Sequence, residues 1–277
     1  MKLIAIFFTA LLLGSPLVQA ALIAYDNFSY TAGATIGGQN GGSGWTGAWA
    51  TNGMATNYSA STALTYSNGS VEVVGDTRTA LVGSNTADLY ARAFAPQTST
   101  LYFSFLFRLD SNTLNVDDFV HFMLNNDTSN DTSGGIGLLS TTTNRLGARI
   151  GTTNGGDTTS SAIDLAANTT YFLVGKIWKN GGANYNTVDL FINPSSNIEP
   201  GTSSATDTVT MTMGTISYFT VRGFNIDADD RYVFDELRIG DTFASVVVPE
   251  PSVAALILGG AAMLIAGRRR PQTPKSR

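Results

Sequence analysis

The stretch that decides the fold is Leu101-Tyr102-Phe103-Ser104-Phe105-Leu106-Phe107-Arg108-Leu109. Every odd-numbered position in it is Leu or Phe, whereas the even-numbered positions include Tyr102, Ser104 and Arg108. A period of two residues is that of a β-strand, in which successive side chains point to opposite faces of a sheet. We therefore predict a half-buried strand over 101–109.

Similar alternation recurs along the chain, separated by turns rich in Asn, Gly, Asp, Ser and Thr. It predicts clear strands over 171–178, 187–193, 215–224 and 231–239. Shorter candidates are 25–30, 71–74, 89–94, 119–124, 136–139 and 146–150. No part of 21–247 shows a sustained apolar period of 3.6 residues. Many short strands with polar turns indicate an all-β domain over 21–247, built as an antiparallel β-sandwich.

Residues 1–20 have the layout of a signal peptide. Lys2 provides the basic start, 3–13 are nearly all apolar, and Val18-Gln19-Ala20 forms a small-x-small cleavage site. We expect the Sec translocon and signal peptidase to handle this segment, so that the mature chain begins at Ala21. The alternative is an N-terminal transmembrane anchor, for which the apolar run is short.

The last segment, 248–277, has three parts. Val248-Pro249-Glu250-Pro251 is a stiff, extended motif, because each proline fixes its own φ and disfavours helix in the residue before it. Residues 252–267 carry no charge and would form a transmembrane helix of about 24 Å, short against a hydrocarbon core of roughly 30 Å. The basic tail 268–277 opens with Arg268, Arg269 and Arg270, which would hold that end in the cytoplasm.

This three-part layout resembles the PEP-CTERM sorting signal of bacterial surface proteins. The resemblance implies that an exosortase recognises the motif 248–251. It also implies that the protein is exported, held transiently in the inner membrane by the C-terminal helix, and then placed at the cell surface or in the extracellular matrix. The alternative is a permanent C-terminal anchor, which the short apolar run with Gly259 and Gly260 disfavours.

The resemblance extends into the domain. Residues 38–45 look like the entry segment of many PEP-CTERM proteins, and 171–176 with 188–194 look like a paired strand unit from them. Residues 234–240 resemble the closing strand of laminin-G-like, concanavalin A-like jelly rolls. A jelly roll of this kind implies that the first strand lies beside the last. That fold serves lectins, glycosidases and adhesion modules alike.

The composition excludes several kinds of site and partner. The chain has no cysteine, so disulfides, thiol nucleophiles and cysteine-ligated zinc are excluded. Of the 16 Lys+Arg and 21 Asp+Glu, 10 and 20 lie in 21–247, which gives that domain a net charge of −10. This sign argues against nucleic acid and anionic membrane surfaces as partners. It is compatible with calcium and with neutral or cationic glycans.

A glycine-rich stretch, 33–53, carries two tryptophans, Trp45 and Trp49. So many glycines favour a loop with tight turns over a regular element. The tryptophans could stack on sugar rings as a ligand platform, or they could be plugs that pack the loop onto the sandwich.

The sequence gives little support to catalysis. Glycoside hydrolysis needs two carboxylates about 5–9 Å apart, and concanavalin A-like hydrolases often carry theirs as Glu-x-Asp-x-x-Glu on one strand. The chain has only four glutamates, Glu72, Glu199, Glu236 and Glu250. None has that spacing, and the adjacent Asp235 and Glu236 would point to opposite faces of a strand. Asp235 falls in the row of Val233, Leu237 and Ile239 and would need a partner there, such as Arg238 or a backbone turn.

The single histidine, His121, lies in a predicted strand. A general base would need a nucleophile and an orienting acid beside it. Nothing local supplies both, so we expect a structural or solvent-facing histidine.

Two turns could bind calcium. Asp227, Asp229 and Asp230 supply closely spaced oxygen ligands before the last strand. A weaker second set consists of Asp127, Ser129 and Asp131. Neither set matches an EF-hand loop, and solvated turn carboxylates are the alternative.

The sequence thus predicts a non-enzymatic, exported β-sandwich that is sorted by an exosortase and binds extracellular polysaccharide. The alternative is a glycan hydrolase or lyase of the same fold. A carboxylate pair in a groove of one sheet would favour the enzyme, whereas a groove with aromatic residues and no such pair would favour binding.

Overall fold

The computed structural model describes residues 22–52, 58–60, 62–82, 88–110, 119–128, 133–139, 145–151, 159–209, 212–224, 226 and 230–247. These residues are almost entirely β-strand and connecting turns, and all strand pairs in the described part are antiparallel. The prediction of an all-β, antiparallel fold is confirmed.

The strands form two large sheets. Sheet 1 has eight strands, in the spatial order β15 (Ala205–Thr208), β14 (Thr187–Ile192), β13 (Thr170–Trp178), β8 (Leu101–Leu109), β17 (Arg231–Gly240), β6 (Arg78–Val82) and β3 (Tyr58–Ala60), with β1 (Leu22–Asp26) also beside β17. Sheet 2 has seven strands, in the order β12 (Thr159–Asp164), β11 (Arg145–Gly151), β10 (Ser133–Leu138), β9 (Phe119–Asn125), β16 (Ile216–Phe224), β7 (Asp88–Gln97) and β2 (Ala50–Asn52). Two further elements are not hydrogen-bonded into either sheet. They are a hairpin of β4 (Thr65–Asn68) and β5 (Val71–Val74), and a short helix, α1 (Phe243–Val247).

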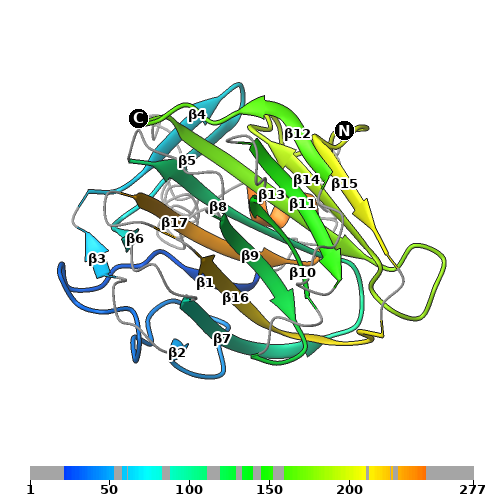
Figure 1. Cartoon of the computed structure of the whole chain (residues 1–277), viewed down its shortest axis with the longest axis horizontal. Coiled ribbons are helices and arrows are strands. Elements are labelled where there is room, and N and C mark those ends of the chain that lie inside the picture. The colour runs from blue at the N-terminus through cyan, green and yellow to red at the C-terminus, as the bar shows by residue number, and fades with distance from the viewer. Residues whose placement is uncertain are drawn as a thin grey trace, which may run out of the picture.

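Phenylalanine rings join the two sheets face to face. The ring of Phe122 in β9 lies 4.1 Å from that of Phe105 in β8 and 5.2 Å from that of Phe234 in β17, between centroids. In Figure 1, β9 accordingly passes in front of β17. Two antiparallel sheets packed over a shared core are consistent with a jelly-roll sandwich.

The outer face of sheet 1 is covered too. The β4–β5 hairpin and α1 lie on it and form a second apolar cluster, in which Val73 and Val246 pack with Leu106 and Phe172. Residues 101–109 therefore form a strand that is buried on both faces. The prediction of a half-buried strand is wrong, because the covering segments come from distant parts of the chain.

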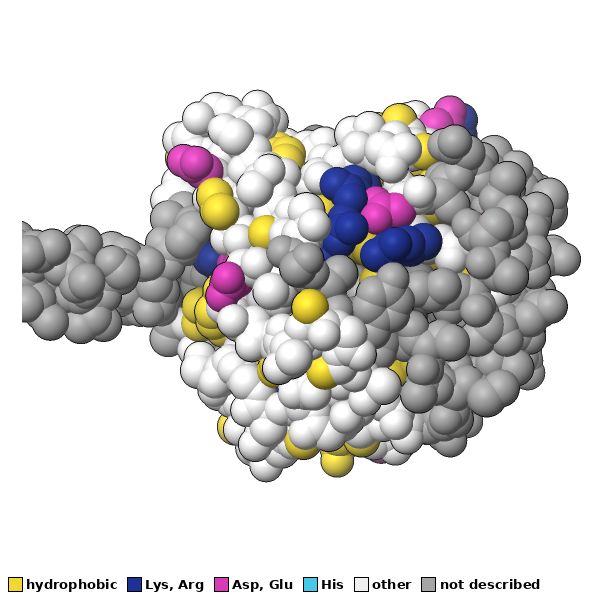
Figure 2. All heavy atoms as spheres, turned by 90° about the vertical axis from the view of Figure 1, so that its left-hand side faces the viewer, with side chains coloured by type: hydrophobic (Ala, Val, Ile, Leu, Met, Phe, Trp, Pro, Cys, Tyr) yellow, Lys and Arg dark blue, Asp and Glu magenta, His cyan; other side chains and the backbone are white. Residues whose placement is uncertain are grey.

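A basic cluster occupies another part of this face. Arg78, Arg108 and Arg231, on three neighbouring strands, all pair with Asp110. The side chain of Arg231 is 35 % exposed, so the cluster reaches the surface. Figure 2 shows the side of the molecule that lies at the left of Figure 1, with one compact group of basic side chains around an acidic one.

The predicted strand positions agree closely with β8, β13, β14, β16 and β17. The first strand lies earlier than the predicted 25–30, because the chain turns after Asp26. Its carboxylate accepts a hydrogen bond from the Phe28 amide, and Phe28 has a φ of 53°. The expectation that the first strand lies beside the last is confirmed, since β1 pairs with β17.

The expected localisation has to be corrected. In the part of the chain that the structure describes, no helix is long and apolar enough to cross a membrane. This finding contradicts the expected export through a transient inner-membrane anchor. The segments on which that expectation rested, 1–20 and 248–277, lie outside the described residues. The sorting residues Val248, Pro249, Glu250, Pro251, Arg268, Arg269 and Arg270 are among them, so their recognition by an exosortase stays a prediction.

Candidate functional site

The candidate site is the outer face of sheet 2, which points away from the core between the sheets. The middle of this face is buried, with Met123 and Thr220 at 0 % exposure, whereas Phe119, Arg222 and Phe224 are partly exposed. Directly paired residues of neighbouring strands lie on the same side of a sheet, so the register defines rows across this face. One row consists of Arg149, Gly135, Met123, Thr220, Ala91 and Ala50. The next row consists of Gly147, Gly137, His121, Arg222 and Leu89. The alternating partners of these residues, such as Phe122 and Val221, point into the core.

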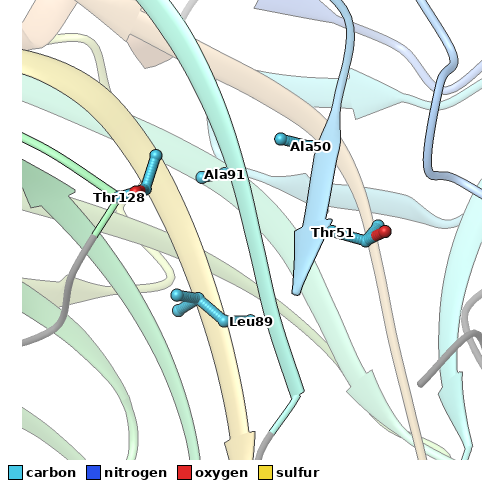
Figure 3. Close-up of a pocket in the computed structure, with 5 residues that line it drawn as sticks. All are labelled: Ala50, Thr51, Leu89, Ala91 and Thr128. Atoms are coloured by element: carbon cyan, nitrogen blue, oxygen red, sulfur yellow. The ribbon is translucent and has the colours of Figure 1, made fainter. Parts of the chain in front are cut away.

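A hollow of about 250 Å³ opens at this face. It is lined by Ala50 and Thr51 of β2, Leu89 and Ala91 of β7, and Thr128 after β9. Figure 3 shows Thr128 on one side of Ala91 and β2 on the other. Pockets for small molecules hold roughly 300–1,000 Å³. The hollow therefore suits one unit of a longer ligand that lies along the sheet.

An aromatic pair with an arginine stands on the same face. The rings of Phe119 and Phe224 stack with centroids 5.4 Å apart. The guanidinium carbon of Arg222 lies 5.0 Å from the first ring centroid and 5.7 Å from the second. All three side chains are partly exposed, so an apolar surface and a positive charge are presented together.

His121 lies directly opposite Arg222 and is only 4 % exposed. Burial lowers the pKa of its imidazole to about 3, helped by the positive charges of Arg149 and Arg222 and opposed by a hydrogen bond with the Gly135 backbone. The ring is therefore neutral near pH 7. Its Nε2 atom has no hydrogen-bond partner among the described residues.

Two glycines of β10 allow β9 to approach closely beside His121. Gly137 is its cross-strand partner, and Gly135 is the partner of Met123. A Cβ atom at Gly135 would come within 2.0 Å of the Phe122 carbonyl oxygen and 2.8 Å of His121 Nε2. A larger residue at position 135 is therefore excluded by the close approach of β9.

The described residues of these rows contain no carboxylate. Asp164, on the edge strand β12, pairs with Arg145. The carboxylate pair needed for glycoside hydrolysis is thus missing from the described strands of this face.

Trp45 and Trp49 lie elsewhere, around an ion pair in the interior. Trp49 is 2 % exposed, and its Nε1 donates a 2.9 Å hydrogen bond to Asp26. The same carboxylate pairs with the buried Arg92, whose guanidinium carbon lies 4.8 Å from the Trp45 ring centroid. A sugar platform needs an exposed ring face, so the buried Trp49 corresponds to a plug that holds the glycine-rich loop on the sandwich. Trp45 is partly exposed, and its role as a sugar platform stays a prediction.

Of the three carboxylates before the last strand, only Asp230 is described, and it is 1 % exposed. Asp227 and Asp229 lie outside the described residues, as does Asp131, whereas Asp127 is described and exposed. No group of three or more possible His, Cys, Asp or Glu ligands occurs in the described ranges. Calcium binding therefore stays a prediction.

Asp235 and Glu236 lie in sheet 1, where β17 bulges. Glu236 has a φ of 55°, and the register with β8 shifts between Asp235 and Arg238. The predicted single row of Val233 and Leu237 is therefore wrong, because they face opposite sides of the sheet. The bulge was not visible in the alternation, which continues through it.

Partners satisfy both carboxylates. Asp235 accepts hydrogen bonds from the backbone amides of Leu64 (3.0 Å) and Glu236 (2.8 Å), which fits the predicted backbone partner. Burial raises its pKa to about 8. Glu236 accepts from the Tyr25 hydroxyl and from Arg238, both at 2.8 Å.

Sequence reasoning missed the residues of the sheet 2 face other than His121. Alternation over 215–224 does place Arg222 and Phe224 on one side of a strand. Nothing local, however, tells that β9 pairs with β16, which brings Phe119 and His121 beside them.

Comparison with known proteins finds similarities among solved structures. No family model matches the sequence, and no curated protein matches it. Among solved structures, the endo-beta-1,4-glucuronan lyase from the fungus Trichoderma reesei is 15 % identical, covering 78 % of this chain and 98 % of its own, with a TM-score of 0.44. The metal-free Emp46p carbohydrate recognition domain is 9 % identical, with coverages of 70 % and 88 % and a TM-score of 0.43. The lectin UEA-II, complexed with galactose, is 14 % identical, with coverages of 66 % and 97 % and a TM-score of 0.41. Similarities this low carry no argument about activity, and the fold follows from the strand topology.

Proposed function

We propose that the protein is a non-enzymatic glycan-binding β-sandwich whose binding surface is the outer face of sheet 2. The observation that carries this proposal is a hollow over small residues, next to an aromatic pair with an arginine, without a carboxylate pair on the described strands. A groove of this composition favours binding over hydrolysis.

The chemistry of this face suits a sugar. The partly exposed rings of Phe119 and Phe224 offer apolar surface to the C–H face of a pyranose. Arg222 and the Thr51 and Thr128 hydroxyls at the hollow can pair with sugar hydroxyl groups. Because the floor at Ala50 and Ala91 is shallow, a chain of sugars can continue past both ends of the hollow.

The test is a glycan array probed with the full-length chain and with two tryptophan variants. Ala50→Trp places a large ring in the hollow, and we expect it to lose binding at least tenfold. Val74→Trp is the matched control, because Val74 is 58 % exposed on the hairpin that covers sheet 1, and it should bind like the parent. Full binding by Ala50→Trp, or no glycan bound by the parent, would contradict the proposal.

One observation favours a second candidate, a polysaccharide lyase. Elimination from a uronic acid needs a neutral base near the carbon next to the carboxylate and positive charges to stabilise the developing charge. Arg149 and Arg222 supply the positive charges, and His121 supplies a neutral imidazole, although its pKa of about 3 makes it a weak base. Release of unsaturated ends from a polyuronate, detected by ultraviolet absorbance and lost in His121→Gln, would favour the lyase over the binding protein.

A further inference from the structure

His121 presents an unused polar atom at the centre of the proposed binding face. His121 is only 4 % exposed, yet its Nε2 atom has no hydrogen-bond partner within the described ranges. A buried polar atom without a partner costs free energy, and such atoms recur where a ligand supplies the missing bond. Gly135 on β10 packs closely against this atom, since a Cβ at position 135 would lie 2.8 Å from Nε2.

Positive charge gathers around that atom. Arg222 is the cross-strand neighbour of His121, and Arg149 stands one row away across Gly135. Both guanidiniums act electrostatically on the imidazole, and the carboxylate of Asp207 acts in turn on Arg149. The chain as a whole carries a net charge of −5, so this surface differs in sign from the average of the molecule.

From these contacts we infer that the face selects anionic glycans, with the acidic group of one sugar held by Arg149 and Arg222 and a hydroxyl of the same chain bonded to His121 Nε2. This inference rests on the proposed function and names its ligand class. It differs from the expectation of neutral or cationic glycans, which rested on the net charge of the domain. Net charge acts over the whole molecule, whereas a bound group experiences the charges within a few ångströms of it.

The acidic group could be a carboxylate or a sulfate ester, since planar guanidiniums bind both. Four polymers distinguish a carboxylate from a sulfate ester and test whether binding requires a negative charge. They are polygalacturonate, the same polymer after reduction of its carboxyl groups, dextran sulfate and dextran. We expect the full-length chain to bind at least one anionic polymer at least tenfold more tightly than its neutral counterpart, measured by calorimetric titration.

Arginine variants locate the site. Arg222→Gln and Arg149→Gln should each weaken binding of the anionic polymer at least tenfold, and Arg222→Lys should restore part of the loss because it keeps the charge. The matched control is Arg108→Gln on the outer face of sheet 1, where Arg108 pairs with Asp110. It should bind like the parent, and circular dichroism would confirm that each variant is folded.

The outcomes are distinct. Equal binding of charged and neutral polymers, or parent-like affinity in Arg149→Gln and Arg222→Gln, overturns the anionic selectivity and leaves glycan binding standing. Loss of binding in Arg108→Gln alone moves the anion site to the cluster of Figure 2 and also overturns it. Absence of binding to every polymer and every arrayed glycan overturns the proposed function as well.

Discussion

His121 and Arg222 face each other as a directly paired couple across β9 and β16, on the outer face of sheet 2. The two residues lie far apart in sequence and meet only because of the register of these two strands. The sequence around His121 predicts only a histidine in a strand, with no catalytic group beside it. The pairing with β16 turns it into part of a basic, partly aromatic surface.

The contact between the two sheets predicts a large loss of stability when the Phe122 side chain is truncated. Its ring is fully buried and touches rings from both β8 and β17. Phe122→Ala should therefore lower the free energy of unfolding by about 3–5 kcal/mol. Urea titration measures this, with Val74→Ala on the exposed hairpin as the control that should change by less than about 0.5 kcal/mol. A loss no larger than the control's would contradict the packing described here.

The buried ion pair of Asp26 and Arg92 predicts that the stability of the fold depends strongly on both side chains. Each side chain is at most 1 % exposed, and Asp26 also accepts bonds from Tyr30 (2.6 Å) and Trp49 (2.9 Å). Arg92→Met leaves a buried carboxylate without its cation and should cost about 3–5 kcal/mol of stability. Arg145→Gln breaks an exposed pair with Asp164 and should lower stability far less, because solvent screens that pair. Similar losses in the two variants would argue against the buried arrangement.

Asp235 predicts that stability falls as pH rises. Burial raises its pKa in the folded state to about 8, whereas an unfolded aspartate has a pKa of about 3.9. Between these values only the folded state holds the proton, so the free energy of unfolding decreases by up to about 1.4 kcal/mol per pH unit. Glu236 and Asp76 are the acidic groups that reinforce the shift. Urea midpoints measured from pH 6.5 to 8 should fall in the parent and fall less in Asp235→Asn, and identical slopes would refute this.

His121 predicts the opposite trend at lower pH. Its folded-state pKa is about 3, below the 6.5 of an unfolded histidine. As pH falls below 6.5 only the unfolded state takes up the proton, so stability is lost towards pH 3. Between about pH 4 and 6.5 this loss opposes the gain from Asp235. Compared with the parent, His121→Gln should therefore gain stability on acidification from pH 6.5 to 4.5, and a parallel pH profile would show that the imidazole is not buried.

The sequence predicted the strands of the two sheets better than the segments that cover the outer face of sheet 1. The period of two over 101–109 identifies β8 and its inward row of Leu and Phe, because alternation is a local property of a strand. The burial of Tyr102 and Leu106 on the other side depends on α1 and the β4–β5 hairpin, which pack there from distant segments. Local pattern carries no information about such contacts.

The site shows the same limit. Arg222 and Phe224 were on one side of a predicted strand, and His121 was singled out, but their meeting depends on pairing between segments about a hundred residues apart. The bulge at Glu236 reverses the facing of Leu237 relative to Val233, and no residue type in the sequence marks it. The sequence does not show why positions 135 and 137 are glycine. The reason is that β10 pairs closely with β9 beside His121.

Hydrogen–deuterium exchange of the full-length chain, with and without the glycan that it binds most tightly on the array, tests the proposed binding face most directly. Bound ligand should slow exchange in peptides that cover β9 and β16, at 119–125 and 216–224, because the glycan covers the partly exposed side chains of Phe119, Arg222 and Phe224. Peptides from the β4–β5 hairpin, at 65–74, cover the opposite sheet and should exchange at the same rate in both samples. Protection of the hairpin, with unchanged exchange in β9 and β16, would contradict a binding face on sheet 2.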